Sequence, residues 1–256
     1  MTLKKTQKEA GYKVKTFTVP FPSEEIKENI SVSTLTTEKK PSKEDLINKA
    51  FKYHSKGNRK EALKYYQEFI NQGFSDHRVF ANNGAILQDL GRLEEAKIST
   101  IKALSVKPNY AIGHYNLGGI LKDMGDLKEA EISTREAIKL NPNLPEAYTN
   151  LGTILKDKGD LEEALRNTNE AIKINPHFEI AHLNLGNIFK DMGDIGKAEI
   201  STRKAIELKP DFAEAHSKLG TILKDLGDLK GAEMSTRKAI ELKPSHADFH
   251  YNLGII

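Results

Sequence analysis

A row of amide side chains runs through most of the sequence at a constant spacing. Its members lie 34 residues apart, and one is a lysine: Asn82, Asn116, Asn150, Asn184, Lys218 and Asn252. An asparagine side chain has one acceptor oxygen and two donor protons, so it can pair with a peptide main chain whatever the peptide's side chains are. The lysine could add a contact to a carboxylate. The row therefore indicates a peptide-binding site, unless asparagine is simply the residue that recurs at this position.

Two further rows accompany the amides. The residues directly before them change in type, as a non-repeating ligand would require and as drift would also produce: Tyr115, Thr149, Leu183, Ser217 and Tyr251. Six residues after the amides come lysines that are each followed by aspartate: Lys122, Lys156, Lys190 and Lys224. A groove of mixed charge could select polar peptides. We favour solvated helix ends and ion pairs between repeats, because exposed pairs contribute little energy.

Histidines form a fourth row, which could suggest metal binding. They are His114, His182, His216 and His250, with Tyr148 among them. Neighbours in such a row lie about 10 Å apart, the packing distance of helices, which is too far to share an ion with bonds near 2 Å. We expect partly buried packing residues. His246 lies four residues before His250, but this pair lacks a third ligand, so the sequence predicts no metal.

Catalytic patterns are missing from the sequence. The glycines do not cluster into a phosphate-binding loop, and neither a nucleophile elbow nor an HExxH motif occurs. The Ser-Thr pairs recur with the 34-residue spacing and are a feature of the repeat. The sequence therefore predicts neither an enzyme nor a cofactor.

Two helices per 34 residues must position these rows. Small residues and prolines recur with the same spacing: Gly84, Gly118, Gly152, Gly186 and Gly220; Ala130, Ala164, Ala198 and Ala232; Pro142, Pro176 and Pro210. Within residues 145–178, Gly152 lies in the middle of the first helix, where glycine costs about 1 kcal/mol relative to alanine. Close approach of the second helix at Ala164 and Ala171 would offset that cost. Pro176 then ends the second helix.

The connection between the two helices is also encoded. Gly159 can adopt the left-handed backbone that closes a helix. Asp160 precedes the second helix, and Glu163 stands at the capping-box spacing. Asp194 and Asp228 lack that glutamate, so we expect weaker helix starts there.

This pattern of Leu-Gly, Ala, Ala and Pro within 34 residues resembles the tetratricopeptide repeat family. The resemblance covers residues 43–256 and implies an all-α, right-handed superhelical solenoid with a concave groove lined by first helices. The repeats are expected at 43–76 (a degenerate cap), 77–110, 111–144, 145–178, 179–212, 213–246 and, in part, 247–256. The asparagine row is similar to the ladder in O-linked N-acetylglucosamine transferases, which grips the substrate main chain.

The sequence departs from the family pattern in three places. The aromatic of the second helix is kept at Tyr66 but is replaced by threonine in later repeats, such as Thr168, which should soften them. The first repeat has Ala50 where glycine is usual. The last repeat has no second helix, so we expect a fragment, or an end covered by another molecule or by self-association.

The remaining composition limits location and partners. Residues 1–42 carry the whole net charge of +3, so the neutral repeats give no electrostatic reason to bind nucleic acid. This leader is expected to be a disordered linker, although residues 14–22 could dock. There is no cysteine, no membrane-spanning run and no signal-peptide pattern. We expect a cytoplasmic protein that binds neither nucleic acid nor membranes.

Three functions fit these observations. The first is a scaffold that binds a protein or peptide in the concave groove. The second is the substrate-docking arm of a larger enzyme, such as a glycosyltransferase. The third is a structural array that is drifting after recent duplication, because segments such as AEISTRKAI and AEMSTRKAI are nearly identical.

Overall fold

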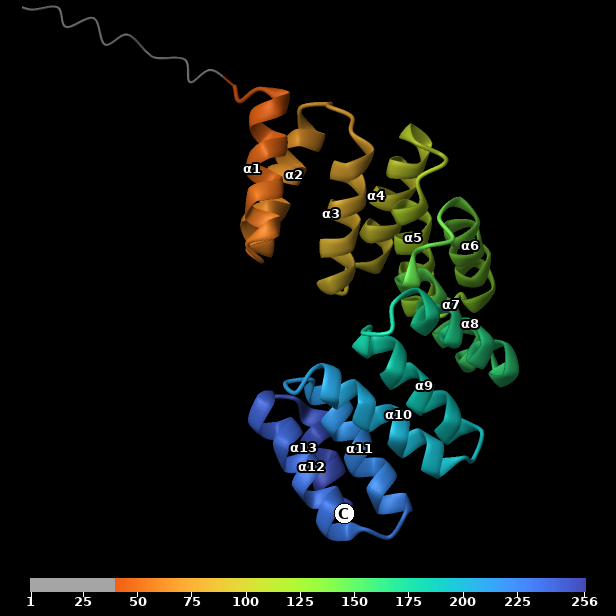
Figure 1. Ribbon diagram of the computed structural model, residues 1–256. Helices are drawn as coiled ribbons and strands as arrows, with labels where there is room; N and C mark the ends of the chain where they lie inside the picture. The colour runs from red at the N-terminus through yellow and green to blue at the C-terminus, as the bar shows by residue number, and fades with distance from the viewer. Residues whose placement is uncertain (1–39) are drawn as a thin grey trace, which may run out of the picture. The chain divides into compact units, whose positions relative to one another are not determined.

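The computed structural model describes residues 40–256, which contain thirteen α-helices and no strand (Figure 1). The predicted all-α solenoid is confirmed for this part of the chain; all but the last three residues of the predicted leader lie outside it. The first helices of the repeats are α1 (Lys43–Ser55), α3 (His77–Asp89), α5 (Ala111–Asp123), α7 (Pro145–Lys158), α9 (Glu179–Asp191), α11 (Ala213–Asp225) and α13 (Ala247–Gly254). The second helices are α2 (Arg59–Asn71), α4 (Leu93–Val106), α6 (Leu127–Leu140), α8 (Leu161–Ile174), α10 (Ile195–Leu208) and α12 (Leu229–Leu242). None of these helices is both long and apolar enough to traverse a lipid bilayer.

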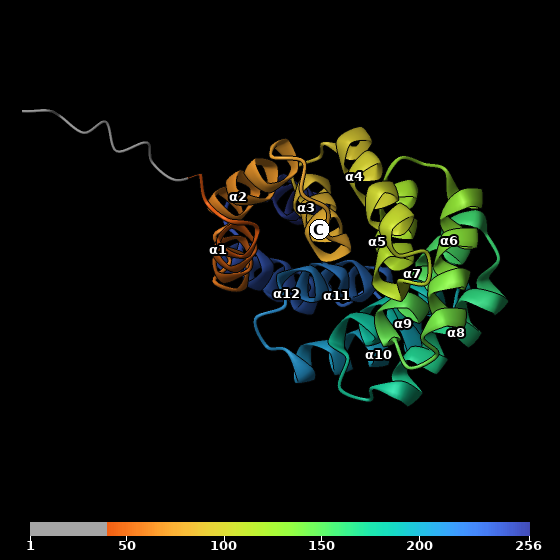
Figure 2. The same ribbon diagram turned by 90° about the horizontal axis from the view of Figure 1, so that it is seen from above.

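Helices pack in the order in which they follow one another along the chain. Each first helix packs against the second helix of its own repeat, and each second helix packs against the next first helix. The first helices α3, α5, α7 and α9 also contact one another, as do α11 and α13. We call the surface of the first helices the inner face and that of the second helices the outer face. Figure 2 shows α4, α6, α8 and α10 around the outside of the array.

The turn inside each repeat depends on a glycine. Gly159 closes α7 with φ of 88°, a left-handed conformation that other residues rarely adopt. Its N–H donates to the Lys156 carbonyl at 2.9 Å, and the Asp160 N–H donates to the Leu155 carbonyl at 2.8 Å. These two bonds satisfy carbonyls that the end of a helix leaves open. The predicted role of Gly159 is confirmed.

The helix caps differ from the prediction. Asp160 makes no side-chain cap hydrogen bond and instead lies 3.5 Å from the Lys158 ammonium. Asp194 and Asp228, which lack the downstream glutamate, do cap their helices, at 3.0 Å from the Lys197 N–H and 2.9 Å from the Gly231 N–H. The predicted cap at Asp160 is therefore wrong, whereas Asp194 and Asp228 keep their caps as expected, because an aspartate accepts from the main chain without a downstream glutamate. The weaker helix starts expected at Asp194 and Asp228 stay a prediction.

The glycines in the middle of the first helices mark the closest approach of the two helices. A Cβ on Gly152 would overlap the Thr168 hydroxyl and would lie 3.3 Å from the Ala164 carbonyl oxygen. The predicted close approach is confirmed, but the surface that meets Gly152 is a threonine side chain and a main-chain carbonyl, not alanine methyl groups. Thr168 and its counterparts in the other repeats are fully buried: Thr100, Thr134, Thr202 and Thr236. Each of these threonines thus occupies the space that a side chain on the glycine of its own repeat would need.

The first repeat contains the largest side chains of the core. Tyr66 and Phe69 of α2 are fully buried and pack with Leu46 and Ala50 of α1. Ala50 stands where later repeats have glycine, and Tyr66 stands where they have threonine. Ser42 and Asp45 form a complete capping box at the start of α1. This repeat therefore closes its end of the array with an aromatic core.

Candidate functional site

The asparagine row lies on the inner face, one residue per first helix. Each member is the sixth residue of its helix, on α3, α5, α7, α9, α11 and α13. The five asparagines are half-buried, whereas Lys218 is exposed. The repeat thus brings the six residues of this row, which are part of the predicted peptide-binding set, into one line across the inner face.

The amide nitrogens of this row already donate to the preceding repeat. Asn116 donates to the Ala81 carbonyl at 3.5 Å, and Asn184 donates to the Thr149 carbonyl at 3.5 Å and to Thr153 Oγ1 at 2.8 Å. A carbonyl can only accept, so these contacts fix which way the two amides face. Asn150 donates to Thr134 Oγ1 at 3.3 Å and Asn252 to Ser217 Oγ at 3.0 Å.

The amide oxygens of Asn116, Asn150, Asn184 and Asn252 have no hydrogen-bond partner within residues 40–256. The row therefore presents acceptors more than donors. An acceptor row pairs with N–H groups, which every residue of a peptide main chain except proline supplies.

The variable row is mostly closed to a ligand. Thr149, Leu183 and Ser217 are buried, with exposed fractions of 4%, 7% and 4%. Tyr115 is half-buried and Tyr251 is exposed. Burial, and then the charge of Glu146, raises the pKa of the Tyr115 phenol, so it stays neutral and can donate. Of the residues predicted to tune specificity, only the two tyrosines are accessible to a ligand.

The lysine and aspartate row forms ion pairs, several of them between repeats. Lys156 lies 2.8 Å from Asp157 and 3.6 Å from Asp191 of the next repeat, and Lys190 lies 2.8 Å from Asp225. Burial lowers the pKa of Lys156, but the hydrogen bonds and charges of Asp157 and Asp191 outweigh it and raise that pKa overall.

The remaining members of that row follow the same arrangement in part. Lys122 lies 3.3 Å from Asp123, which also accepts from Gln88 at 2.6 Å. These contacts agree with the favoured interpretation of ion pairs between repeats. Lys218 and Lys224 of α11 have no carboxylate within ion-pair distance in the described part of the chain.

Each histidine of the row forms a hydrogen bond with the loop that joins its repeat to the preceding one. The Nε2 atoms of His114, His182, His216 and His250 lie 2.8, 3.0, 2.9 and 2.7 Å from the carbonyl oxygen of the proline six residues earlier. Each Nε2 must carry a proton, because a carbonyl only accepts. Sequence reasoning missed this bond, although the constant six-residue spacing from proline to histidine was visible. No group of three or more metal-ligating side chains occurs within residues 40–256.

A second cluster that the sequence did not reveal lies on the inner face at the first repeat. Phe51, His54, Ser55, Tyr66 and Asn82 line a hollow of about 270 Å³. The Tyr66 hydroxyl lies 3.0 Å from His54 Nδ1 and also bonds the Asn82 side chain. Burial raises the pKa of Tyr66 to about 12, while the bond from Asn82 acts in the opposite direction. The first asparagine of the row is thereby joined to the aromatic core.

We expect this cluster to make the stability of the first repeat depend on pH. Burial, and then the charge of Arg59, lowers the pKa of His54 below its ordinary value, although Asp89 opposes the shift. The folded state therefore favours neutral His54. The resulting stabilisation is complete above the unfolded pKa of about 6.5 and is lost as the pH falls below it.

We expect the urea concentration at the unfolding midpoint of the first repeat to decrease when the pH is lowered from 7.5 to 5.5. Hydrogen exchange of the amides of α1 and α2 measures this midpoint. His54→Gln keeps a hydrogen-bonding side chain without a titrating group and should flatten this pH dependence. An equal slope in both proteins would contradict the assignment to His54; His77, whose pKa is also lowered by burial, is unchanged in both.

Comparison with known proteins places most of this array in one repeat family. Models described as tetratricopeptide repeat match residues 77–110, 111–144, 134–166, 180–212 and 213–246, and one described as TPR repeat matches residues 152–193. Together they cover residues 77–246 without a gap. No curated protein sequence matches the chain.

Solved structures show the same fold. A thermophilic TPR protein of Thermus thermophilus is 25% identical, with a TM-score of 0.65, over 70% of this chain and 98% of that one. The protein MamA is 26% identical, with a TM-score of 0.52, over 64% of this chain and 96% of that one. The Cut9–Hcn1 hetero-tetramer of the APC/C matches with a TM-score of 0.74 over 84% of this chain and 42% of that one, but at 14% identity it shows the fold alone.

Proposed function

Since this chain belongs to the tetratricopeptide repeat family, we propose that it is a protein-interaction scaffold that holds an extended peptide along its inner face. The observation that carries the proposal is the row of half-buried asparagines, four of which have a side-chain oxygen without a hydrogen-bond partner among residues 40–256. Those oxygens are acceptors for the N–H groups of a guest main chain.

The spacing of the row suits an extended guest. Neighbouring first helices pack about 10 Å apart, and an extended chain advances about 3.3 Å per residue. One amide oxygen then meets the guest at about every third residue. The bonds from the amide nitrogens to the preceding repeat hold each side chain in place, so little side-chain entropy is lost when a guest binds.

Side chains beside the row would set the preference for particular guests. Tyr115 and Tyr251 offer exposed or half-exposed rings with hydroxyl groups. Lys218 and Lys224 are cations without an ion-pair partner in residues 40–256, whereas Lys156 and Lys190 are already paired. A guest with a carboxylate near α11 is therefore favoured over a uniformly basic one.

The proposal is tested by selecting peptides from a random-sequence library on the intact chain and measuring their affinity by calorimetry. We expect the triple variant Asn116→Ala, Asn150→Ala and Asn184→Ala to bind the selected peptides with an affinity that is lower by about tenfold or more. The reason is that each lost neutral hydrogen bond costs about 0.5–1.5 kcal/mol. Selected peptides should carry a carboxylate and should compete with one another for one site.

The control for this test must separate binding from folding, because the same amides also tie repeats together. Asn109 and Asn143 are exposed loop asparagines without side-chain hydrogen bonds in the described chain, so Asn109→Ala with Asn143→Ala should leave affinity unchanged. Thermal unfolding of each variant shows whether the array is intact at the temperature of the titration. A folded triple variant that binds the peptides at full strength would exclude the asparagine row as the site.

A further inference from the structure

The outer face carries a row of exposed apolar side chains that the inner-face function does not use. Ile98, Ile132, Ile200 and Met234 occupy one repeat position on second helices, with exposed fractions of 55%, 53%, 70% and 65%. Arg166 interrupts the row on α8. Single exposed apolar residues are ordinary on protein surfaces, but a patch of them indicates an interaction site, and Ile200 and Met234 stand at the same position on successive second helices.

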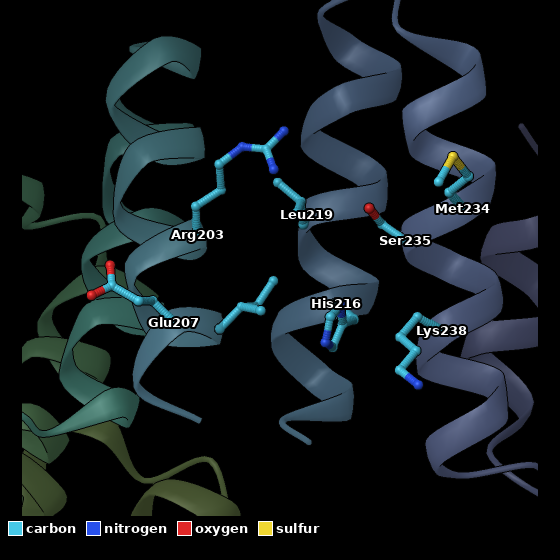
Figure 3. A pocket seen from close by; sticks show the side chains of 8 residues that line it. Arg203, Glu207, His216, Leu219, Met234, Ser235 and Lys238 are labelled. Carbon is cyan, nitrogen blue, oxygen red and sulfur yellow. The ribbon is translucent and has the colours of Figure 1, made fainter. Parts of the chain in front are cut away.

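The row is most exposed on α10 and α12, where a groove accompanies it. Ile206 of α10, Leu219 of α11 and Met234 of α12 form its apolar lining, and its volume is about 560 Å³ (Figure 3). Figure 3 shows α11, with His216 and Leu219, between α10 and α12; Arg203 extends from α10 toward Leu219, and Lys238 lies on α12. An apolar knob and an apolar groove thus lie side by side on one surface.

The charged side chains around Ile200 and Met234 already form ion pairs within their own helices. Arg203 pairs with Glu199 at 2.7 Å, and Arg237 pairs with Glu233 at 2.8 Å. The same holds one turn further on, where Lys204 pairs with Glu207 and Lys238 with Glu241. An acidic ligand would have to displace these carboxylates. A partner that brings both signs at the same spacing would only exchange one carboxylate for another.

A second copy of this chain meets that condition. On each of the two helices, glutamate and arginine stand one turn apart beside the apolar residue. A copy whose α10 and α12 run antiparallel to these helices places its arginines opposite Glu199 and Glu233, and its glutamates opposite Arg203 and Arg237. Such an arrangement is an isologous two-fold contact, the commonest symmetry of protein dimers.

We propose that the outer face of α10 and α12 is a self-association surface on which a second copy docks in this antiparallel orientation. Each helix is about 20 Å long and presents a strip about 10 Å wide, the diameter of a helix with its side chains. A contact of this size buries roughly 800 Å² in total, below the range of stable complexes. The dimer is therefore weak, and it leaves both inner faces free for guests.

Sedimentation velocity of the intact chain from low micromolar to near-millimolar concentrations tests the proposal. The average mass should rise toward that of a dimer. Ile200→Ser with Met234→Ser should weaken association at least tenfold. Ile132→Ser removes an equally placed residue on α6 and should leave association unchanged; an equal loss in this control would overturn the location.

Charge reversal tests the orientation. Arg203→Glu with Arg237→Glu gives one acidic variant, and Glu199→Arg with Glu233→Arg gives one basic variant. Each alone should remain monomeric, because like charges then face each other, and their equimolar mixture should associate. A chain that is monomeric at every concentration, or a mixture that does not associate, would overturn the proposal.

Discussion

Gly152→Ala is expected to lower the free energy of unfolding by about 1–3 kcal/mol, the usual cost of overpacking a core. Alanine alone would favour the helix by about 1 kcal/mol. The added Cβ, however, would overlap the Thr168 hydroxyl and crowd the Ala164 carbonyl. Threonine has few side-chain rotamers in a helix, so its hydroxyl cannot move away cheaply. Urea unfolding followed by circular dichroism measures the change.

The array supplies its own controls for this prediction. Gly254 belongs to the same row, but a Cβ there would meet no atom of residues 40–256 within 4 Å, so Gly254→Ala should be neutral. Thr168→Ala removes the group that collides with the new methyl. The Gly152→Ala and Thr168→Ala changes should therefore be less than additive, with a coupling of about 0.5–3 kcal/mol. Strict additivity would show that the threonine does not cause the loss.

The position of Gly152 amplifies the effect. Solenoid stability is close to a sum of repeat stabilities and contacts between neighbours. Gly152 lies in α7, between three complete repeats on one side and two on the other. A weak repeat at this place lets the two sides unfold separately. We expect the unfolding transition of the variant to broaden or to split in two, whereas Gly254→Ala keeps the parent profile.

The sequence predicted the repeat and its closing glycines because both depend on local backbone conformation. Gly159 needs a left-handed φ, and no distant contact changes that requirement. Asp160 was predicted wrongly because a side chain can exchange a cap for a nearby lysine, Lys158. Such a choice depends on the three-dimensional position of Lys158, which the 34-residue pattern does not contain.

The candidate site was predictable in its residues but not in its orientation. Spacing alone placed the asparagines in one line on the inner face. It could not show that the Asn184 amide nitrogen donates to the Thr149 carbonyl and to Thr153 Oγ1, or that Leu183 is buried. Both facts depend on contacts with neighbouring helices, since Leu183 packs with Ala205 and Ala215 and the Asn184 amide reaches the preceding repeat. The exposed isoleucines of the second helices were visible at the same spacing, but an apolar residue on a helix predicts burial first, and only the packing reveals the exception at Ile200.

The second large effect is expected at Tyr66, the largest fully buried side chain in the described chain. Its ring lies 6.1 Å from that of Phe51 and packs in one core with Ala50, whereas the later repeats have threonine and glycine at the positions of Tyr66 and Ala50. Tyr66→Ala should cost about 3–5 kcal/mol, as aromatic truncations in cores do. Because each repeat of a solenoid contacts only its neighbours, the loss of stability should be confined to the end of the array that contains the first repeat. Hydrogen exchange should therefore show α1 and α2 unprotected while α9 to α12 keep their protection.

Two milder substitutions decide which part of Tyr66 matters. Tyr66→Phe keeps the ring and loses only the hydroxyl that bonds His54 and Asn82, so it should cost about 1 kcal/mol. Tyr66→Thr installs the residue of the later repeats, but Ala50 was matched to a ring, so the resulting cavity should leave this variant nearly as unstable as Tyr66→Ala. A stable Tyr66→Thr variant would mean that threonine suits any repeat. The aromatic core would then not be what closes this end of the array.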